Sequence, residues 1–146
     1  GNCYRFGWGI KKDPRKAIEW YKKSMDNGYY EFNIYDSISF VLYDIIFEME
    51  KIGTSFQKIA RSKELAEGIQ YAEYAINHFD CENAEDGDIY ITLAELYRYK
   101  NLDRALDYAE YAVALGVEDA NETLKSLRLA NGTFGNIGRF LSGIFD

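Results

Sequence analysis

The residue types that most often carry chemistry are sparse in this chain. Its 146 residues include one histidine, His78, and two cysteines, Cys3 and Cys81. A catalytic or metal-binding histidine normally shares its site with a second ligand or an orienting group, and no second histidine exists. His78 stands near the end of a predicted helix, where a positive charge interacts favourably with the helix dipole. We therefore expect His78 to be a surface residue.

The acidic segment DCENAEDGD, residues 80–88, invites comparison with a calcium-binding loop. An EF-hand loop has glycine at its sixth position and a bidentate carboxylate at its twelfth. With Gly87 at the sixth position, the third is Ala84 and the twelfth is Leu93, and neither of these carries a carboxylate. The sequence therefore predicts a polar connection between helices and no metal site.

Two short motifs of enzymes occur without the residues that would complete them. Ser55-x-x-Lys58 matches a nucleophile motif of penicillin-recognising enzymes, but neither Ser-Asp-Asn nor Lys-Thr-Gly accompanies it. Gly7-x-Gly9 lacks the next glycine, the strand and the acidic residue of a dinucleotide site. Because no nucleophile, base and orienting group occur together, the sequence predicts a protein that is not an enzyme and has no cofactor.

The composition is that of a folded chain with an acidic surface. Hydrophobic residues make up 47% of the sequence and aromatic residues 16%, which argues against disorder. The net charge of −7 argues against nucleic acid or an anionic membrane as partner, because both are bound by basic surfaces. No run of 18 apolar residues occurs, so we expect no membrane span. A basic or neutral protein partner fits this charge best.

The number of cysteines and the first residues of the chain concern the cellular compartment in which the protein is found. Two cysteines cannot form a disulfide framework, which favours a reducing, cytoplasmic setting. The chain has no initiator methionine and begins within a predicted helix, so we expect a fragment of a longer chain, and the absent signal peptide carries little information. The glycosylation sequons at Asn121 and Asn131 matter only if the protein is secreted.

The elements that must position any site begin with residues 1–28, which predict a short helix, a glycine loop and a second helix. Asp13 is a good N-cap for the second helix, and Pro14 suits its first position. Asn27-Gly28 offers the left-handed turn that ends it. The stripe of this helix has helical spacing and consists of Ala17, Trp20, Tyr21 and Ser24. We expect Trp20 and Tyr21, the two aromatic members, to supply the buried area.

Residues 29–53 predict a long helix that is apolar on more than one side, as a helix between two neighbours would be. Thr54-x-x-Gln57 then fits a capping box that begins a new element. The apolar stripe of the long helix consists of Tyr35, Ile38, Leu42, Ile45, Ile46 and Met49.

Further helices are predicted after this one. One covers residues 63–79, with an apolar face at Tyr71, Ala72, Ala75 and Ile76. Asp88 is expected to cap the next, Asn101 caps a fourth that Gly116 closes, and residues 118–130 form one more that ends at Asn131-Gly132. Residues 133–146 place apolar side chains at helical spacing, weakened by three glycines. For this tail we weigh three roles: a cap over the end of the array, a partner-binding or self-association segment, and membrane-surface contact.

The helices repeat along the chain. Placing Ala17 on Ala105, an offset of 88, also pairs the caps Asp13 and Asn101 and the terminators Gly28 and Gly116. The sequence YAEYA occurs twice, at residues 71–75 and 108–112, an offset of 37. We therefore predict repeated units at residues 1–28, 29–80 and 88–116 of a single domain, followed by the helix 118–130 and the tail.

The first unit also contains a spaced set of glycine and aromatic residues. In order, these are Gly1-x-x-Tyr4-x-x-Gly7-x-Gly9-Ile10-x-x-Asp13, then Ala17-Ile18-x-Trp20-Tyr21 and a closing Gly28. This order resembles the Sel-one-like repeat, a two-helix relative of the tetratricopeptide repeat. The last unit lacks the long glycine loop and is closer to a plain tetratricopeptide repeat. The predicted fold is all-α: a right-handed α-solenoid of stacked antiparallel helix pairs with an amphipathic C-terminal capping helix.

The resemblance to the tetratricopeptide class implies peptide recognition on the concave side, which the first helices line. Two arginines at equivalent positions there can hold a carboxylate or a backbone carbonyl, and the alternative is that they are plain surface residues. Setting Tyr4 against Tyr97 pairs Asn2 with Glu95 and Arg5 with Arg98, away from the core face. We predict a non-catalytic adaptor or scaffold that binds a peptide or a partner domain at these four residues.

A second interpretation makes the chain a structural end-piece of a longer array. Its activity would then be self-association through the aromatic helix at residues 29–53 or through the tail at residues 133–146. Light scattering with and without the tail distinguishes a homo-oligomer from an adaptor.

Overall fold

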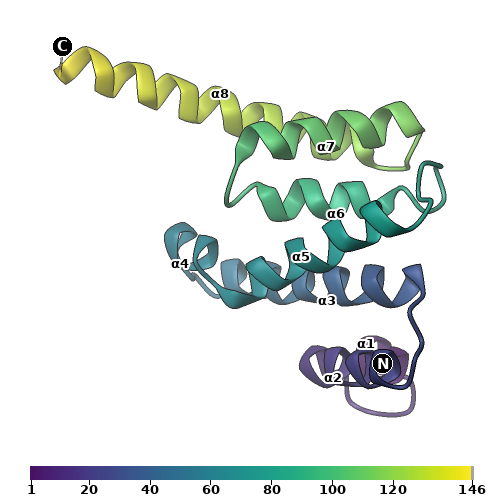
Figure 1. The fold of residues 1–146 in the computed structure, drawn as a ribbon. Helices are drawn as coiled ribbons and strands as arrows, with labels where there is room; N and C mark the ends of the chain where they lie inside the picture. Colours follow the sequence, from purple (N-terminus) through teal and green to yellow (C-terminus); the bar gives the residue numbers. More distant parts are fainter. Residues whose placement is uncertain (146) are drawn as a thin grey trace. The chain divides into compact units, whose positions relative to one another are not determined.

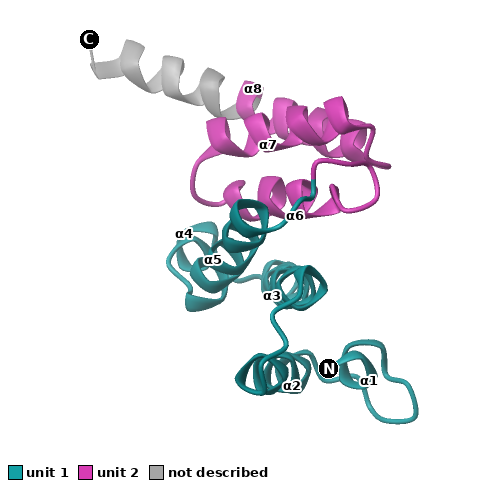
Figure 2. Cartoon of the chain, turned by 45° about the vertical axis from the view of Figure 1, so that its right-hand side comes forward, with its two compact units in different colours: residues 1–81 teal, residues 82–146 magenta. Residues whose placement is uncertain are grey.

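The computed structural model describes the backbone of residues 1–145 and the side chains of residues 1–132 (Figure 1). The described backbone is helical and contains no strand, which confirms the all-α prediction. Contacts divide the chain into two compact units, Gly1–Cys81 (unit 1) and Glu82–Asp146 (unit 2) (Figure 2). Unit 1 holds α1 (Asn2–Phe6), α2 (Pro14–Asp26), α3 (Phe32–Lys51), α4 (Phe56–Ala60) and α5 (Lys63–His78), and unit 2 holds α6 (Asp88–Tyr97), α7 (Leu102–Leu115) and α8 (Ala120–Phe145).

The ends of α2 and α7 follow from local sequence. The Asp13 carboxylate accepts a hydrogen bond from the Lys16 backbone N at 3.1 Å, and the Asn101 side chain accepts one from the Arg104 backbone N at 3.1 Å. Just beyond the helices, Gly28 and Gly116 adopt φ values of +91° and +78°, which glycine adopts without steric cost. The caps and terminators that the sequence paired at an offset of 88 therefore have the same conformations.

The buried face of α2 differs in part from the predicted stripe. Ala17 and Tyr21 are buried against α3 as expected, and Ile18 is buried with them. Trp20 is 46% exposed, so its prediction as a buried residue is wrong. Ile18 lies on the opposite side of the Ala17–Tyr21 line from Trp20 around the helix, and the contact with α3 extends toward Ile18. The exposed indole is covered by the Lys23 ammonium, 4.4 Å from the ring centroid.

The long helix α3 is the centre of unit 1. It packs against α2 and α5 and also contacts α4, which confirms that its apolar sides face separate neighbours (Figure 1). Of the predicted stripe, Met49 is only partly buried. The other five members are buried: Tyr35, Ile38, Leu42, Ile45 and Ile46.

The start of α4 lies one residue later than predicted. Thr54 belongs to the turn that ends α3, because its backbone N donates to the Met49 carbonyl at 2.9 Å. Ser55 is the N-cap, and its hydroxyl accepts from the Lys58 backbone N at 3.3 Å. The capping box over Thr54 and Gln57 is therefore wrong, although a helix does begin there.

In unit 2, α7 presents alanines to its neighbours. Ala105, Ala109 and Ala112 are fully buried, and α7 packs against both α6 and α8. Gly87, and not Asp88, is the N-cap of α6. A Cβ at position 87 would lie 2.6 Å from the Asn83 carbonyl oxygen and 2.6 Å from a Val117 methyl carbon, so only glycine fits there.

The last helix continues further than the sequence suggested. α8 passes through Asn131-Gly132, so the expected helix end at this pair is wrong. Gly132 is not among the glycines with positive φ, and a glycine with helical φ and ψ weakens a helix without ending it. The amphipathic capping face predicted for residues 133–146 lies outside the residues whose side chains are described.

A helix that spans a membrane must be long and apolar. Across the described residues, every helix is too short or too polar to cross a lipid bilayer.

Candidate functional site

Local hydrogen bonds engage several of the residues first considered for chemistry. His78 is the last residue of α5, where its Nδ1 lies 2.8 Å from the Tyr74 carbonyl oxygen and its ring stacks on Tyr74. In the acidic loop, the Asn83 side-chain oxygen accepts from the backbone N of Glu85 and of Asp86, which closes a turn. No group of three or more His, Cys, Asp or Glu side chains in the described part could hold a metal ion.

The thiols differ in exposure. Cys3 on α1 is exposed and Cys81 is buried, and neither thiol forms a disulfide.

Arg5 and Asn2, two predicted site residues, lie on α1 and contact neighbouring helices. The Tyr21 hydroxyl donates to the Asn2 side-chain oxygen. Arg5 donates from Nη1 to the Ser37 hydroxyl on α3 at 3.2 Å. Its guanidinium carbon lies 4.8 Å from the Phe6 ring centroid and 4.7 Å from that of Phe40. Arg5 is therefore held between two aromatic rings from successive first helices.

Glu95 and Arg98, the other two predicted site residues, form an ion pair in unit 2. Arg98 Nε lies 3.0 Å from a Glu95 carboxylate oxygen, and Arg98 Nη2 also donates to the Ser126 hydroxyl on α8 at 3.1 Å. Each arginine thus donates to a serine of the following first helix, Ser37 or Ser126. The sequence pairing of the two arginines did not include these serines, because their hydrogen bonds become visible only in three dimensions.

Unit 1 also contains a row of aromatic side chains that the sequence did not reveal. Phe6 stacks on Trp8 with 4.9 Å between centroids, and Arg5 joins Phe6 to Phe40 on α3. From Phe40 the row continues along α3, with 6.1 Å to Tyr43 and 6.5 Å from Tyr43 to Phe47. We call these six residues the aromatic row: Trp8, Phe6, Arg5, Phe40, Tyr43 and Phe47. Its rings are well exposed at three places, Trp8 (62%), Phe6 (50%) and Phe47 (51%).

The row ends at a cleft between the start of α2 and the second half of α3. This apolar cleft has a volume of about 660 Å³, and Phe47 forms part of its wall. Ile52, which also lines the cleft, is 81% exposed. Polar lining comes from Lys12, Arg15, Asp44 and Glu48, and apolar lining from Pro14, Ile45, Phe47, Met49 and Ile52.

Asp44 connects the cleft electrostatically to the row. Burial raises the pKa of this carboxyl above its ordinary value, and the positive charges of Lys12 and Arg5 oppose the rise. The carboxylate is therefore influenced by a cation of the cleft, Lys12, and by the cation of the row, Arg5.

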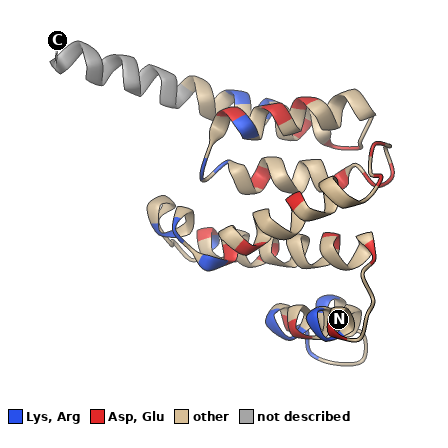
Figure 3. Ribbon diagram, viewed as in Figure 1, with Lys and Arg blue, Asp and Glu red and all other residues tan. Residues whose placement is uncertain are grey.

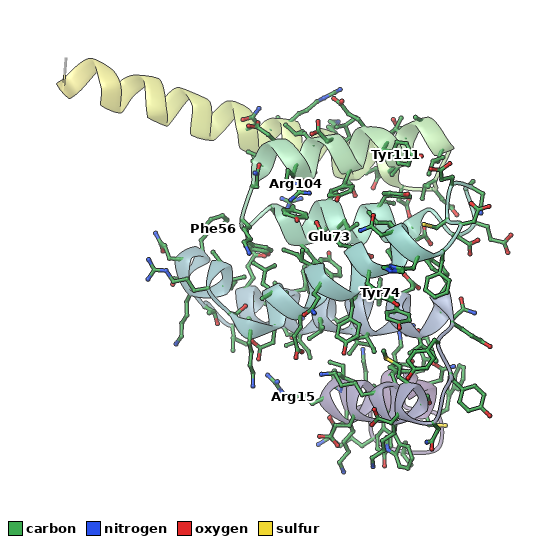
Figure 4. The ribbon with its side chains drawn as sticks, in the orientation of Figure 1. Arg15, Phe56, Glu73, Tyr74, Arg104 and Tyr111 are labelled. Carbon is green, nitrogen blue, oxygen red and sulfur yellow. The ribbon has the colours of Figure 1, made fainter. Side chains whose placement is uncertain are left out.

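A second hollow adjoins the cleft at Met49. It has a volume of about 530 Å³ and lies between the end of α3, α4 and the start of α5. Arg15 of the cleft forms an ion pair with Glu64 of this hollow at 3.4 Å; Figure 4 labels Arg15 on α2 and Phe56 on α4. The hollow is lined by Met49, Ser55, Gln57, Lys58, Arg61, Ser62 and Glu64.

These features are suited to holding another chain. They combine exposed rings, a fixed guanidinium and an apolar hollow, and such side chains dominate the energy of protein interfaces. Of the charged residues that line the cleft, Arg15 pairs with Glu64 of the second hollow and Glu48 pairs with Lys51.

The comparisons with known proteins agree with the internal repeat. The family model for the Sel1 repeat matches residues 1–29 and 93–117, which together are less than half of the chain. These stretches end one residue after Gly28 and one residue after Gly116, so their ends correspond at the offset of 88. No match was found among curated proteins or among solved structures.

Proposed function

Since this chain is a Sel1 repeat protein, we propose that it is a non-catalytic adaptor or scaffold whose first helices bind a peptide or a domain of a partner protein. Sel1 repeats are typically protein-interaction modules. The observation that carries the proposal is the aromatic row of unit 1. Three of its five rings are well exposed, and exposed apolar patches on monomeric proteins often mark binding sites.

The row is ordered before a partner arrives. The ring stack of Trp8 and Phe6, and the hold of two rings on Arg5, restrict these side chains in the free protein. Binding then costs less conformational entropy, because the side chains have few rotamers left to lose. The row is elongated along α1 and α3, which suits an extended segment better than a compact ligand.

The arginines add directional hydrogen-bond donors to the surface. A guanidinium can donate in parallel to a carboxylate, and it also donates to backbone carbonyls. We propose that Asn2 and Arg5 belong to the partner-binding surface of unit 1, and that Glu95 and Arg98 form a second contact in unit 2. Two donors of Arg98 are already engaged by Glu95 and Ser126, so we expect Arg98 to contribute less than Arg5.

The test is a binding measurement with the full chain. Immobilised protein captures partners from an extract of the source cells, and a captured protein is purified and titrated by calorimetry. Phe47→Ala and Arg5→Glu should each weaken binding by at least about tenfold, since they remove an exposed anchor and reverse the charge of the row.

The matched control for Phe47→Ala is Tyr29→Ala, which removes an exposed ring of unit 1 outside the row. Arg128→Glu, at an exposed ion pair with Glu110, is the control for Arg5→Glu. If a partner is found and neither variant of the row changes its affinity, the site assignment is wrong. If no purified protein binds, the adaptor function itself fails.

The exposed rings also favour one alternative, in which a second copy of the chain covers the row. This structural end-piece would self-associate through the aromatic helix or the tail. Light scattering at rising concentration, with and without residues 133–146, separates it from the adaptor: a molar mass of one chain throughout excludes self-association.

A further inference from the structure

The proposed function does not specify the chemistry of the partner. The residues around the apolar cleft of unit 1 indicate which kind of segment would bind. We propose that the bound segment is acidic and carries a large apolar side chain. The apolar side chain enters the apolar cleft beside Phe47 and Ile52, and the acidic residues meet a group of cations around α4. This inference rests on the proposed function and specifies its partner.

The charge of this end is opposite to that of the whole chain. The protein has a net charge of −7, yet residues 51–63 contain four basic residues and no acidic one. Figure 3 shows blue segments on α4 and at the adjoining ends of α3 and α5. We call these residues the basic rim: Lys51, Lys58, Arg61 and Lys63.

Nearby carboxylates pair with only one of the four rim cations, within the described residues. Lys51 pairs with Glu48 at 3.5 Å, and Arg15 of α2 pairs with Glu64. Further along α5, Glu67 pairs with Lys22 at 3.4 Å.

The cations that favour the ionised form of Asp44 are Lys12 and Arg5, neither of which belongs to the rim. Within the described residues, Lys58, Arg61 and Lys63 have no ion-pair partner. Three cations are therefore available to an acidic partner.

Apolar anchors stand beside these cations. Ile52 is the most exposed large hydrophobic residue described, and it follows the end of α3 directly. Phe56 on α4 and Phe47 on α3 are each about half exposed. An isolated exposed isoleucine needs no explanation, but one that lines a cleft with a phenylalanine gives an apolar side chain a place to insert.

The space is adequate for the proposed segment. The cleft of about 660 Å³ falls within the ~300–1,000 Å³ typical of ligand sites. The second hollow continues from it at Met49 toward Lys58 and Arg61. A segment that places its apolar side chain in the cleft can thus run into the hollow, where its carboxylates reach the rim.

A polyanion such as RNA is disfavoured by the same charges. Nucleic acids need an extended basic surface, whereas the positive stretch here is confined to residues 51–63 of an acidic chain. A short acidic segment gains from the local cations and avoids the repulsion of the remainder.

The experiment uses two displayed libraries of short peptides with a fixed central phenylalanine or leucine. One library varies the other positions among Asp, Glu, Ser and Gly, and the second has Lys and Arg in place of the acids. We expect the full chain to enrich the acidic library, with affinity that falls as salt is raised. Equal enrichment from both libraries, or none from either, would overturn the proposal.

Variants locate the binding of an enriched acidic peptide. The triple reversal Lys58→Glu, Arg61→Glu and Lys63→Glu should lower its affinity by at least about tenfold. Ile52→Ser should also lower it without affecting the fold, because Ile52 is almost fully exposed. The matched control is the triple reversal Lys100→Glu, Lys125→Glu and Arg128→Glu, which changes the net charge equally in unit 2. Unchanged binding by the rim variant would contradict the inference.

Two further outcomes separate this inference from the function on which it rests. If a purified natural partner depends on Phe47 and Arg5 but not on the rim, the adaptor function stands and the acidic-partner inference fails. If single-stranded polyuridylate competes with the peptide at equal charge concentration, the rim binds polyanions in general and the inference also fails.

Discussion

The pKa of Asp44 reflects the balance between burial of its carboxyl group and the charges of its neighbours. Asp44 lies on α3, where the positive charges of Lys12 and Arg5 favour its ionised form and the negative charge of Glu48 disfavours it. Burial disfavours that form more strongly, so the pKa of the carboxyl is raised. The folded protein therefore holds a proton at Asp44 more tightly than the unfolded chain does.

This leads to a prediction for stability against pH. Below the ordinary pKa of Asp44, the carboxyl is protonated in both states and costs nothing. As pH rises to the raised pKa of the folded state, the unfolded chain releases its proton first, and the free energy of unfolding falls. Above that window the full cost remains. We expect Asp44→Asn to raise the free energy of unfolding at neutral pH, measured by urea denaturation, with no gain at acidic pH.

The control for this prediction is Glu19→Gln, which replaces an exposed carboxylate on α2. It should not reproduce the pH-dependent gain. A decrease in stability for Asp44→Asn at neutral pH would show that attraction to Lys12 and Arg5 outweighs burial.

At the scale of the element, helix boundaries depend on what surrounds them as well as on their own residues. Gly87 begins α6 in a tight space between Asn83 and Val117. Gly132 lies within α8, where no other atom would lie within 4 Å of an added Cβ. Substitution of the two glycines should therefore have opposite effects on stability.

Alanine substitutions test this difference. Gly87→Ala should destabilise the protein by about 1–3 kcal/mol, because the new methyl overlaps backbone and side-chain atoms that must shift. Gly132→Ala should stabilise it by roughly 0.5–1 kcal/mol through helix propensity. Thermal and urea unfolding measure both. Destabilisation by Gly132→Ala would contradict the helical conformation of that residue.

At the scale of the whole molecule, the same two-helix plan recurs at an offset of 88. Asp13 and Asn101 cap equivalent helices in units 1 and 2, each with a hydrogen bond of 3.1 Å. The two equivalent helices therefore begin with the same kind of N-cap, although the surrounding sequences differ.

The equivalence predicts equal energetic costs. Asp13→Ala and Asn101→Ala should each lower the free energy of unfolding by about 1 kcal/mol, since each leaves a backbone N–H without its acceptor. Asp103→Ala, an exposed residue just inside α7, serves as a control that leaves the cap intact. Costs that differ by more than a factor of about three would show that the two caps are not equivalent.

The sequence predicted the features that depend on near neighbours in the chain. Helical periodicity placed α3 and its buried stripe, and cap chemistry placed the starts of α2 and α7. It mispredicted Trp20, because the side of a stripe that faces a neighbour is decided by the neighbour. A glycine pair alone did not end α8.

The candidate site was less accessible to sequence reasoning. The sequence singled out Arg5, but its stacking partner Phe40 and its acceptor Ser37 are more than 30 positions away in the chain. The row and the cleft arise from residues of different helices, and no local pattern links such residues.

The difference in exposure between the two thiols makes the natural sequence convenient for labelling. Cys81 is sealed from solvent, whereas Cys3 is open and lies on the same short helix as Arg5 and Phe6. A maleimide dye should therefore attach at a single place without any cysteine being introduced or removed. Its emission would report directly on whether an arriving molecule touches the edge of the protein where the rings are exposed.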